Sequence, residues 1–125
     1  MSTTIISDDL IASIKAAPGI SIPRRRHGDL IYVETEHAAY EIEVLDPEQR
    51  IVRISSTDKL LHKPKIGMFV QSVVADGNVG VRGWIKQGLR MQFRFADRTF
   101  QSNAVTSAAL RGIGRDGHKF HYEAF

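Results

Sequence analysis

From Asp29 onward the side chains alternate between apolar and polar, and this alternation constrains the fold more than any other feature of the sequence. The clearest case is Leu89–Phe95, where Met91, Phe93 and Phe95 alternate with basic and polar residues. A period of two is that of a β-strand with one buried face. Turn residues separate such segments about every eight to twelve positions, which leaves no gap for the helical crossover that a parallel pair needs. The sequence therefore predicts antiparallel β structure.

We expect about seven or eight short strands, closed into a small barrel. Strands are predicted at 29–35, 37–45, 51–55, 67–75, 80–85, 89–95 and 118–125. The chain passes through the segments 99–101 and 104–111 before the last of these strands, and turns are predicted at 46–49, 76–78 and 96–98. The segment 80–85 is the weakest of these because Gly83 interrupts it. The predicted fold class is all-β and mainly antiparallel, a closed or partly open barrel or a compact sandwich, in one domain over residues 1–125.

One helix is predicted, at about residues 8–17. Ser7 is a good N-cap and the two aspartates after it place carboxylates in the first turn, where the helix dipole favours them. Leu10, Ile11 and Ile14 share one face, and Pro18-Gly19 ends the helix. A helix this short is marginal alone, so we expect it to cap an open end of the barrel or to flank a sheet.

Composition sets the cellular setting and the broad class of partner. No apolar run approaches the roughly 18 to 20 residues of a membrane helix, and the N-terminus has neither the basic nor the apolar region of a signal peptide. We therefore expect a cytoplasmic protein with no membrane partner. The net charge is only +3, so a nucleic-acid partner is not expected. A homo-oligomer remains open.

The basic residues gather in two clusters, of which the first is the candidate ligand site. Arg24, Arg25 and Arg26 follow Pro23 and precede the first predicted strand, where loops often carry binding groups. The arginine fork binds phosphate and carboxylate groups through two parallel hydrogen bonds. We expect these arginines to bind an anionic small molecule or an acidic protein partner; a merely solvated loop is the alternative. The second cluster contains Lys59, His62, Lys63 and Lys65.

No motif predicts a catalytic residue, a metal site or a cofactor. Gly112–Gly117 matches G-x-G-x-x-G, but a predicted strand follows it where a dinucleotide fold needs a helix, so we interpret it as a hairpin turn. His118 and His121 would point to opposite faces of a strand. Ser55–Asp58 supplies hydroxyls beside a carboxylate, but the spacing ties no histidine to it.

Two alternative functions remain open. One is a hydrolase or isomerase whose site assembles from several strands, and its candidate residues are Glu41, Glu43, Arg90 and Arg94. The other is oligonucleotide binding through exposed aromatic rings, or cyclic-dinucleotide binding, which is taken up with the first resemblance below. Its candidates are Tyr32, Trp84, Phe100, Phe120 and Tyr122. Most of these alternate with core aliphatic residues and are assigned to the core, whereas Trp84 is expected at a rim.

Two resemblances bear on these alternatives. Arg24–Arg26 before a strand, followed by Arg53–Asp58, resembles the PilZ-type domain, a small β-barrel that binds cyclic di-GMP. We disfavour it because Gly28 lies near an expected arginine, Arg53 replaces the acid, and Asp58 replaces the glycine. The segment Gly83–Phe93, with Val105–Ser107, is similar to short uncharacterised bacterial all-β domains, a resemblance that implies a β fold and no activity. The favoured interpretation is a non-catalytic binding or interaction module.

Overall fold

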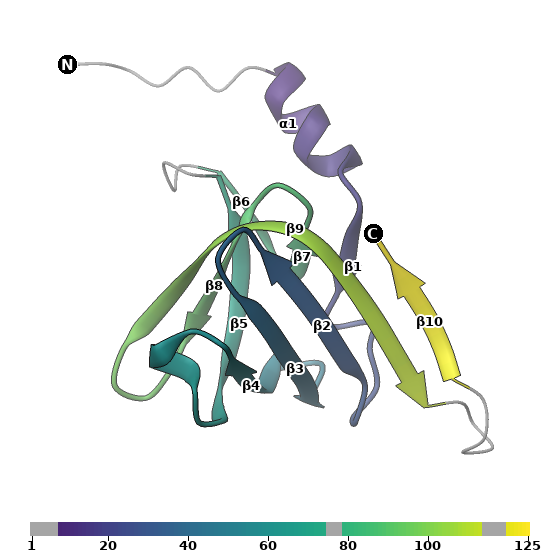
Figure 1. Cartoon of the computed structure of the whole chain (residues 1–125). Helices are drawn as coiled ribbons and strands as arrows, with labels where there is room; N and C mark the ends of the chain where they lie inside the picture. Colours follow the sequence, from purple (N-terminus) through teal and green to yellow (C-terminus); the bar gives the residue numbers. More distant parts are fainter. Residues whose placement is uncertain (1–7, 75–78, 114–119) are drawn as a thin grey trace.

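The computed structural model describes residues 8–74, 79–113 and 120–125. Within these ranges it contains one α-helix, one short 3-10 helix and ten strands (Figure 1). Their bounds are α1 Asp8–Ala16, β1 Gly19–Ser21, β2 Leu30–Thr35, β3 Ala39–Asp46, β4 Ile51–Ser56, η1 Lys59–Leu61, β5 Lys65–Val73, β6 Gly80–Arg82, β7 Trp84–Lys86, β8 Arg90–Arg94, β9 Thr99–Ile113 and β10 Phe120–Ala124.

Six of the strands form a closed ring. Hydrogen bonds join β2 to β3, β3 to β4, β4 to β5, β5 to β8 and β8 to β9, and β9 returns to β2. Every one of these pairs is antiparallel. The predicted fold class, a mainly antiparallel all-β fold with a barrel-like arrangement and one N-terminal helix, is confirmed.

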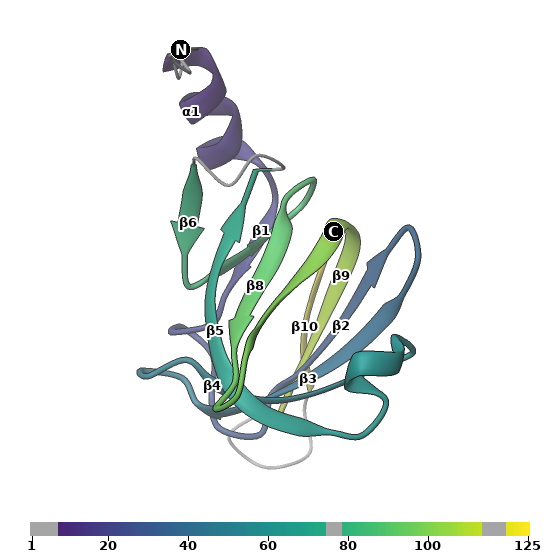
Figure 2. The same cartoon turned by 90° about the vertical axis from the view of Figure 1, so that its left-hand side faces the viewer.

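The remaining strands extend this ring. β6 pairs with β5, and β10 pairs with the second half of β9. β1 and β7 form a separate two-stranded sheet. Ile20 and Ile22 from the β1 segment and Ile85 of β7 belong to the same buried cluster as the inner face of the ring. The small sheet therefore contributes side chains to the core of the ring. Figure 2 shows the chain running from α1 into β1 and on toward the strands of the ring.

Alternation fills the ring with apolar side chains. In β8, Met91 and Phe93 are fully buried, whereas Arg94 is exposed. Phe95, just beyond the strand, is also buried. The interpretation of 89–95 as a half-buried strand is confirmed. The ring holds a packed core whose buried members include Ile31, Val33, Tyr40, Ile42, Val44, Val52, Ile54, Phe69, Val105, Ala108 and Leu110.

β9 is one strand of 15 residues, although the sequence predicted two segments within it. Between Gln101 and Ala104 it carries one more residue than the facing part of β8, so a β-bulge interrupts the ladder. The buried Ser102 hydroxyl accepts a hydrogen bond from the Met91 amide at 2.9 Å and donates one to the Asn103 carbonyl at 2.7 Å. The bulge bends β9 without interrupting it. The first part of β9 pairs with β8 and the later part pairs with β2.

The prediction of one strand over 80–85 is wrong. Gly83 has φ of 75°, a left-handed conformation that glycine adopts without a steric penalty. This turn separates β6, which pairs with β5, from β7, which pairs with β1. The strand β1 itself was not predicted, because three residues are too few to show alternation.

The helix was predicted at about residues 8–17 and is observed at Asp8–Ala16. Figure 1 shows it beyond one end of the ring, leading into β1. Its residue Ile14 is buried. No helix in the described ranges is both long enough and apolar enough to cross a membrane.

Some predictions fall outside the described residues. These are the turn at 76–78, the glycine-rich turn beyond Ile113 and the position of His118. The last predicted strand, 118–125, is observed in its described part as β10.

Candidate functional site

The loop between β1 and β2 carries the three predicted arginines, and backbone hydrogen bonds hold it in shape. The Arg25 amide donates to the Ile22 carbonyl at 3.0 Å. The Arg26 amide donates to the buried carboxylate of Asp29 at 2.9 Å. Gly28, with φ of 93°, donates to the Val44 carbonyl of β3 at 2.8 Å. The loop is therefore ordered before any ligand arrives.

The three arginine side chains lie in different surroundings. Arg24 is exposed and its guanidinium carbon lies 5.4 Å from the centre of the Trp84 ring. Arg25 is half-buried, and its Nε donates to the Ser21 carbonyl at 3.0 Å. Arg26 is exposed. The three adjacent arginines are therefore not equivalent in their surroundings.

A second cation, the ammonium of Lys86, lies close to the Trp84 ring. The Lys86 ammonium lies 4.8 Å from the ring centre. It also donates to the carbonyls of Lys15 and Ala17 at the end of α1, at 3.1 and 2.8 Å. Lysine charge near a helix C-terminus is favourable, because the last carbonyls carry partial negative charge. Lys86 is only 6% exposed, and this burial lowers its pKa below the ordinary lysine value.

A glycine makes this arrangement sterically accessible. A Cβ atom added to Gly19 would lie 2.7 Å from Cδ of Lys86 and 3.1 Å from the Trp84 ring. Gly19 is paired with Lys86 across the two-stranded sheet. We call Arg24, Trp84 and Lys86, supported by Gly19, the cation–indole cluster.

The proximity of Arg24 to Trp84 could not be found from sequence spacing, since the two residues are sixty positions apart. Trp84 is half-buried, consistent with the rim position expected for it. Tyr32 corrects the assignment of most aromatic residues to the core: it is 38% exposed, on the outer face of β2. The signal was present, because the buried Ile31 and Val33 on either side of it require Tyr32 to point outward.

The second basic cluster lies elsewhere. Lys59 belongs to η1, His62 and Lys63 follow it, and all three are exposed. Lys65 begins β5, and its ammonium lies 5.9 Å from the centre of the Phe95 ring.

The four residues of the enzyme alternative do not converge. Glu41 and Glu43 are on β3, whereas Arg90 and Arg94 are on β8, and two strands of the ring separate β3 from β8 in either direction. Glu43 is already paired with Arg53 of β4, at 2.6 Å. Of the four, Glu41 lines the hollow described in the next paragraph.

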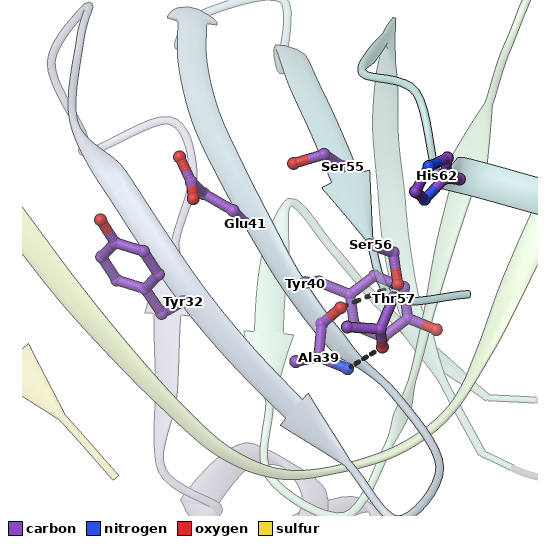
Figure 3. A pocket seen from close by; sticks show the side chains of 8 residues that line it. All are labelled: Tyr32, Ala39, Tyr40, Glu41, Ser55, Ser56, Thr57 and His62. Carbon is purple, nitrogen blue, oxygen red and sulfur yellow. Dashed lines mark hydrogen bonds between the residues drawn. The ribbon is translucent and has the colours of Figure 1, made fainter. Parts of the chain in front are cut away.

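A hollow lies beside β2, β3 and β4, lined by side chains from both faces of β3, with His62 on the side away from Tyr32 (Figure 3). Its volume is about 460 Å³, within the range of small-molecule sites. The lining residues are Tyr32, Ala39, Tyr40, Glu41, Ser55, Ser56, Thr57 and His62. The fold thus brings a histidine to the hydroxyl-rich segment 55–58, which sequence spacing did not predict.

Two of the hydroxyls in the hollow are committed to the backbone. Ser56 donates to the Ala39 carbonyl at 2.8 Å, and Thr57 accepts from the Ala39 amide at 3.0 Å (Figure 3). Within the described residues neither Ser55 nor His62 makes a side-chain hydrogen bond. A nucleophilic serine needs a base within hydrogen-bonding reach, and this arrangement does not supply one.

Tyr40 forms the inner side of the hollow and is 4% exposed. Burial, and then the negative charge of Asp58, raise the pKa of Tyr40 above its ordinary value of 10.0, while a hydrogen bond with Ser56 lowers it.

We expect Tyr40 to ionise at a higher pH than an exposed tyrosine in an absorbance titration at 295 nm. The chain has three tyrosines, and the Tyr40→Phe variant should lose the part of the absorbance change that occurs at the highest pH. Since the pKa is raised in the folded state, its contribution to the free energy of unfolding is fully present below pH 10.0 and is lost as the pH rises through the raised value. If the Tyr40→Phe variant instead loses a part of the absorbance change that occurs at lower pH, this assignment is wrong.

Within the described residues no group of three or more histidine, aspartate or glutamate side chains is placed to hold a metal ion. Comparison of the chain with protein-family models, with curated proteins and with solved structures finds no match.

Proposed function

We propose that the chain is a non-catalytic binding module that takes an anionic ligand at the β1–β2 loop, with Arg24 as the principal contact. The observation that carries this proposal is the state of Arg24. Its guanidinium carbon lies 5.4 Å from the centre of the Trp84 ring, while within the described residues its N–H groups make no hydrogen bond or ion pair.

A guanidinium held close to an aromatic ring is well suited to recognise an anion. The guanidinium presents its donors around the edge of the plane, so stacking on an aromatic face leaves the edge able to bind phosphate or carboxylate. Holding the side chain in place beforehand lowers the entropy lost on binding. Arg25 and Arg26 on the same loop and Lys86 on the same indole add positive potential that attracts an anion.

The assignment as a binding module is supported by how the polar groups elsewhere are used. Glu43 is neutralised by Arg53, and the hydroxyls of Ser56 and Thr57 bridge β4 to the backbone of β3. These groups stabilise the ring. The ligand class is an anionic small molecule or an acidic protein segment, which share carboxylate or phosphate chemistry.

The test is a thermal-shift panel at low and high salt. Inorganic pyrophosphate, a nucleoside triphosphate, a cyclic dinucleotide, a short oligonucleotide and an acidic peptide are compared. We expect at least one anion to raise the melting temperature by a few degrees when present at about 100 times its Kd. The shift should fall steeply as salt rises, because the charges are exposed.

The triple change of Arg24, Arg25 and Arg26 to serine should abolish the shift and leave the protein folded. The matched control changes Lys59, Lys63 and Lys65, which lie in the second basic cluster, and should retain the shift. If no anion stabilises the wild type, or if both triple variants behave alike, the loop is merely solvated and the proposal is wrong.

A further inference from the structure

The two outward glutamates of β3 differ in one respect that points to a second ligand. Glu43 lies opposite Arg53 in the β3–β4 ladder and forms an ion pair with it at 2.6 Å. Glu41 lies opposite Ser55, and within the described residues its carboxylate has no ion pair or hydrogen bond. Arg53 thus neutralises the Glu43 carboxylate, whereas the Glu41 carboxylate, two positions away, is available to a ligand.

Glu41 stands at the centre of a row that a small molecule could span. Its opposite neighbour on β2 is Tyr32, and its opposite neighbour on β4 is Ser55. Neighbouring strands are about 4.8 Å apart, so the row from Tyr32 to Ser55 covers about 10 Å. Figure 3 shows the three side chains along the rim of the hollow, with His62 on its far wall.

The charges around the hollow favour a cation at Glu41. Arg111 lies 5.9 Å from the centre of the Tyr32 ring, so the uncharged body of a ligand, and not its charged head, suits the Tyr32 side of the hollow. Asp58 adds negative potential at the inner side, where it raises the pKa of Tyr40. Glu41 is the one carboxylate among the residues that line the hollow, and it would repel an anion. This hollow and the cation–indole cluster therefore favour ligands of opposite charge.

The far wall limits the ligand to one positive charge. His62 lines it, and the adjoining Lys59 and Lys63 are exposed. A second cationic group placed there would be repelled, whereas an uncharged body would not.

We propose that this hollow binds a small organic monocation, an amine or guanidine with an apolar body, whose charged head pairs with Glu41 and whose body lies against Tyr32.

The test uses phenethylamine as the probe, titrated into the full chain and followed by amide chemical shifts. We expect saturable changes at Tyr32, Glu41, Ser55 and His62. Phenylacetate has the same aromatic body with the opposite charge and should leave these residues unperturbed. Putrescine, with its second ammonium group, should bind more weakly than butylamine.

Two matched variants separate the carboxylates. Glu41→Gln should weaken phenethylamine binding at least about tenfold, because a charge-assisted contact is lost. Glu43→Gln, on the same strand and face, should change it less than about twofold. Absence of saturation in the wild type, equal response to phenylacetate, or equal binding by Glu41→Gln and wild type would overturn the proposal. None of these outcomes depends on Arg24, so this result and that of the anion panel are independent.

Discussion

Replacing Phe93 by alanine is expected to lower the free energy of unfolding by about 3–5 kcal/mol. Phe93 is fully buried at the centre of an aromatic group inside the ring. Its ring centre lies 5.3 Å from that of Phe69, edge to face, and 6.4 and 6.5 Å from those of Phe95 and Phe100. Truncation would remove these contacts and leave a cavity that β5 and β9 cannot close without bending.

The measurement is urea unfolding of the Phe93→Ala and Arg94→Ala variants side by side. Arg94 is the next residue on β8 and points to solvent, so its loss should cost less than about 0.5 kcal/mol. Similar losses at the two positions would contradict the assignment of inner and outer faces.

Replacing Gly67 by valine is expected to cost about 1–3 kcal/mol through overpacking. A Cβ atom built on Gly67 would lie 2.5 Å from Cδ1 of Phe95 and 2.8 Å from the Arg94 carbonyl. Gly67 is in β5 where that strand leaves β4 and approaches β8. The absence of a side chain here lets the Phe95 ring lie directly over the backbone.

Ile66→Val serves as the control, because Ile66 is 58% exposed and should change stability by less than about 0.5 kcal/mol. The cost at Gly67 should also shrink in a Phe95→Ala background, since the two changes share one contact. A Gly67→Val variant as stable as wild type, or one whose cost is the same in both backgrounds, would show that the close approach is absent.

Side-chain alternation was sufficient to predict most of the ring. Two faces of opposite polarity specify a strand and its inward side, as in β2, β3 and β8. The same rule requires Tyr32 to point outward, but the prediction placed the aromatic residues other than Trp84 in the core and was wrong for Tyr32. Features that depend on backbone conformation were harder to predict from the sequence. Gly83 turns the chain through a positive φ, and the bulge at Ser102 depends on a side chain that replaces a ladder hydrogen bond.

The candidate sites were predictable only in part, because each joins distant residues. Arg24–Arg26 was identified as a basic loop, but its contact with Trp84 depends on the pairing of β1 with β7. The isolation of Glu41 depends on which residue of β4 faces it, and a shift of register by two would have given it Arg53. The ring closure that brings such residues together is a property of the whole sheet, and local sequence patterns do not encode it.

The most direct test of anion binding at Arg24 is isothermal titration of pyrophosphate into the wild type and into Arg24→Gln and Trp84→Leu, at low salt. We expect saturable binding by the wild type. Arg24→Gln should bind at least about tenfold more weakly, because it loses a charge-assisted bidentate contact. Trp84→Leu should also weaken binding, since the guanidinium is no longer held by its face. Wild-type affinity in Arg24→Gln, or no binding by any of the three proteins, would contradict it.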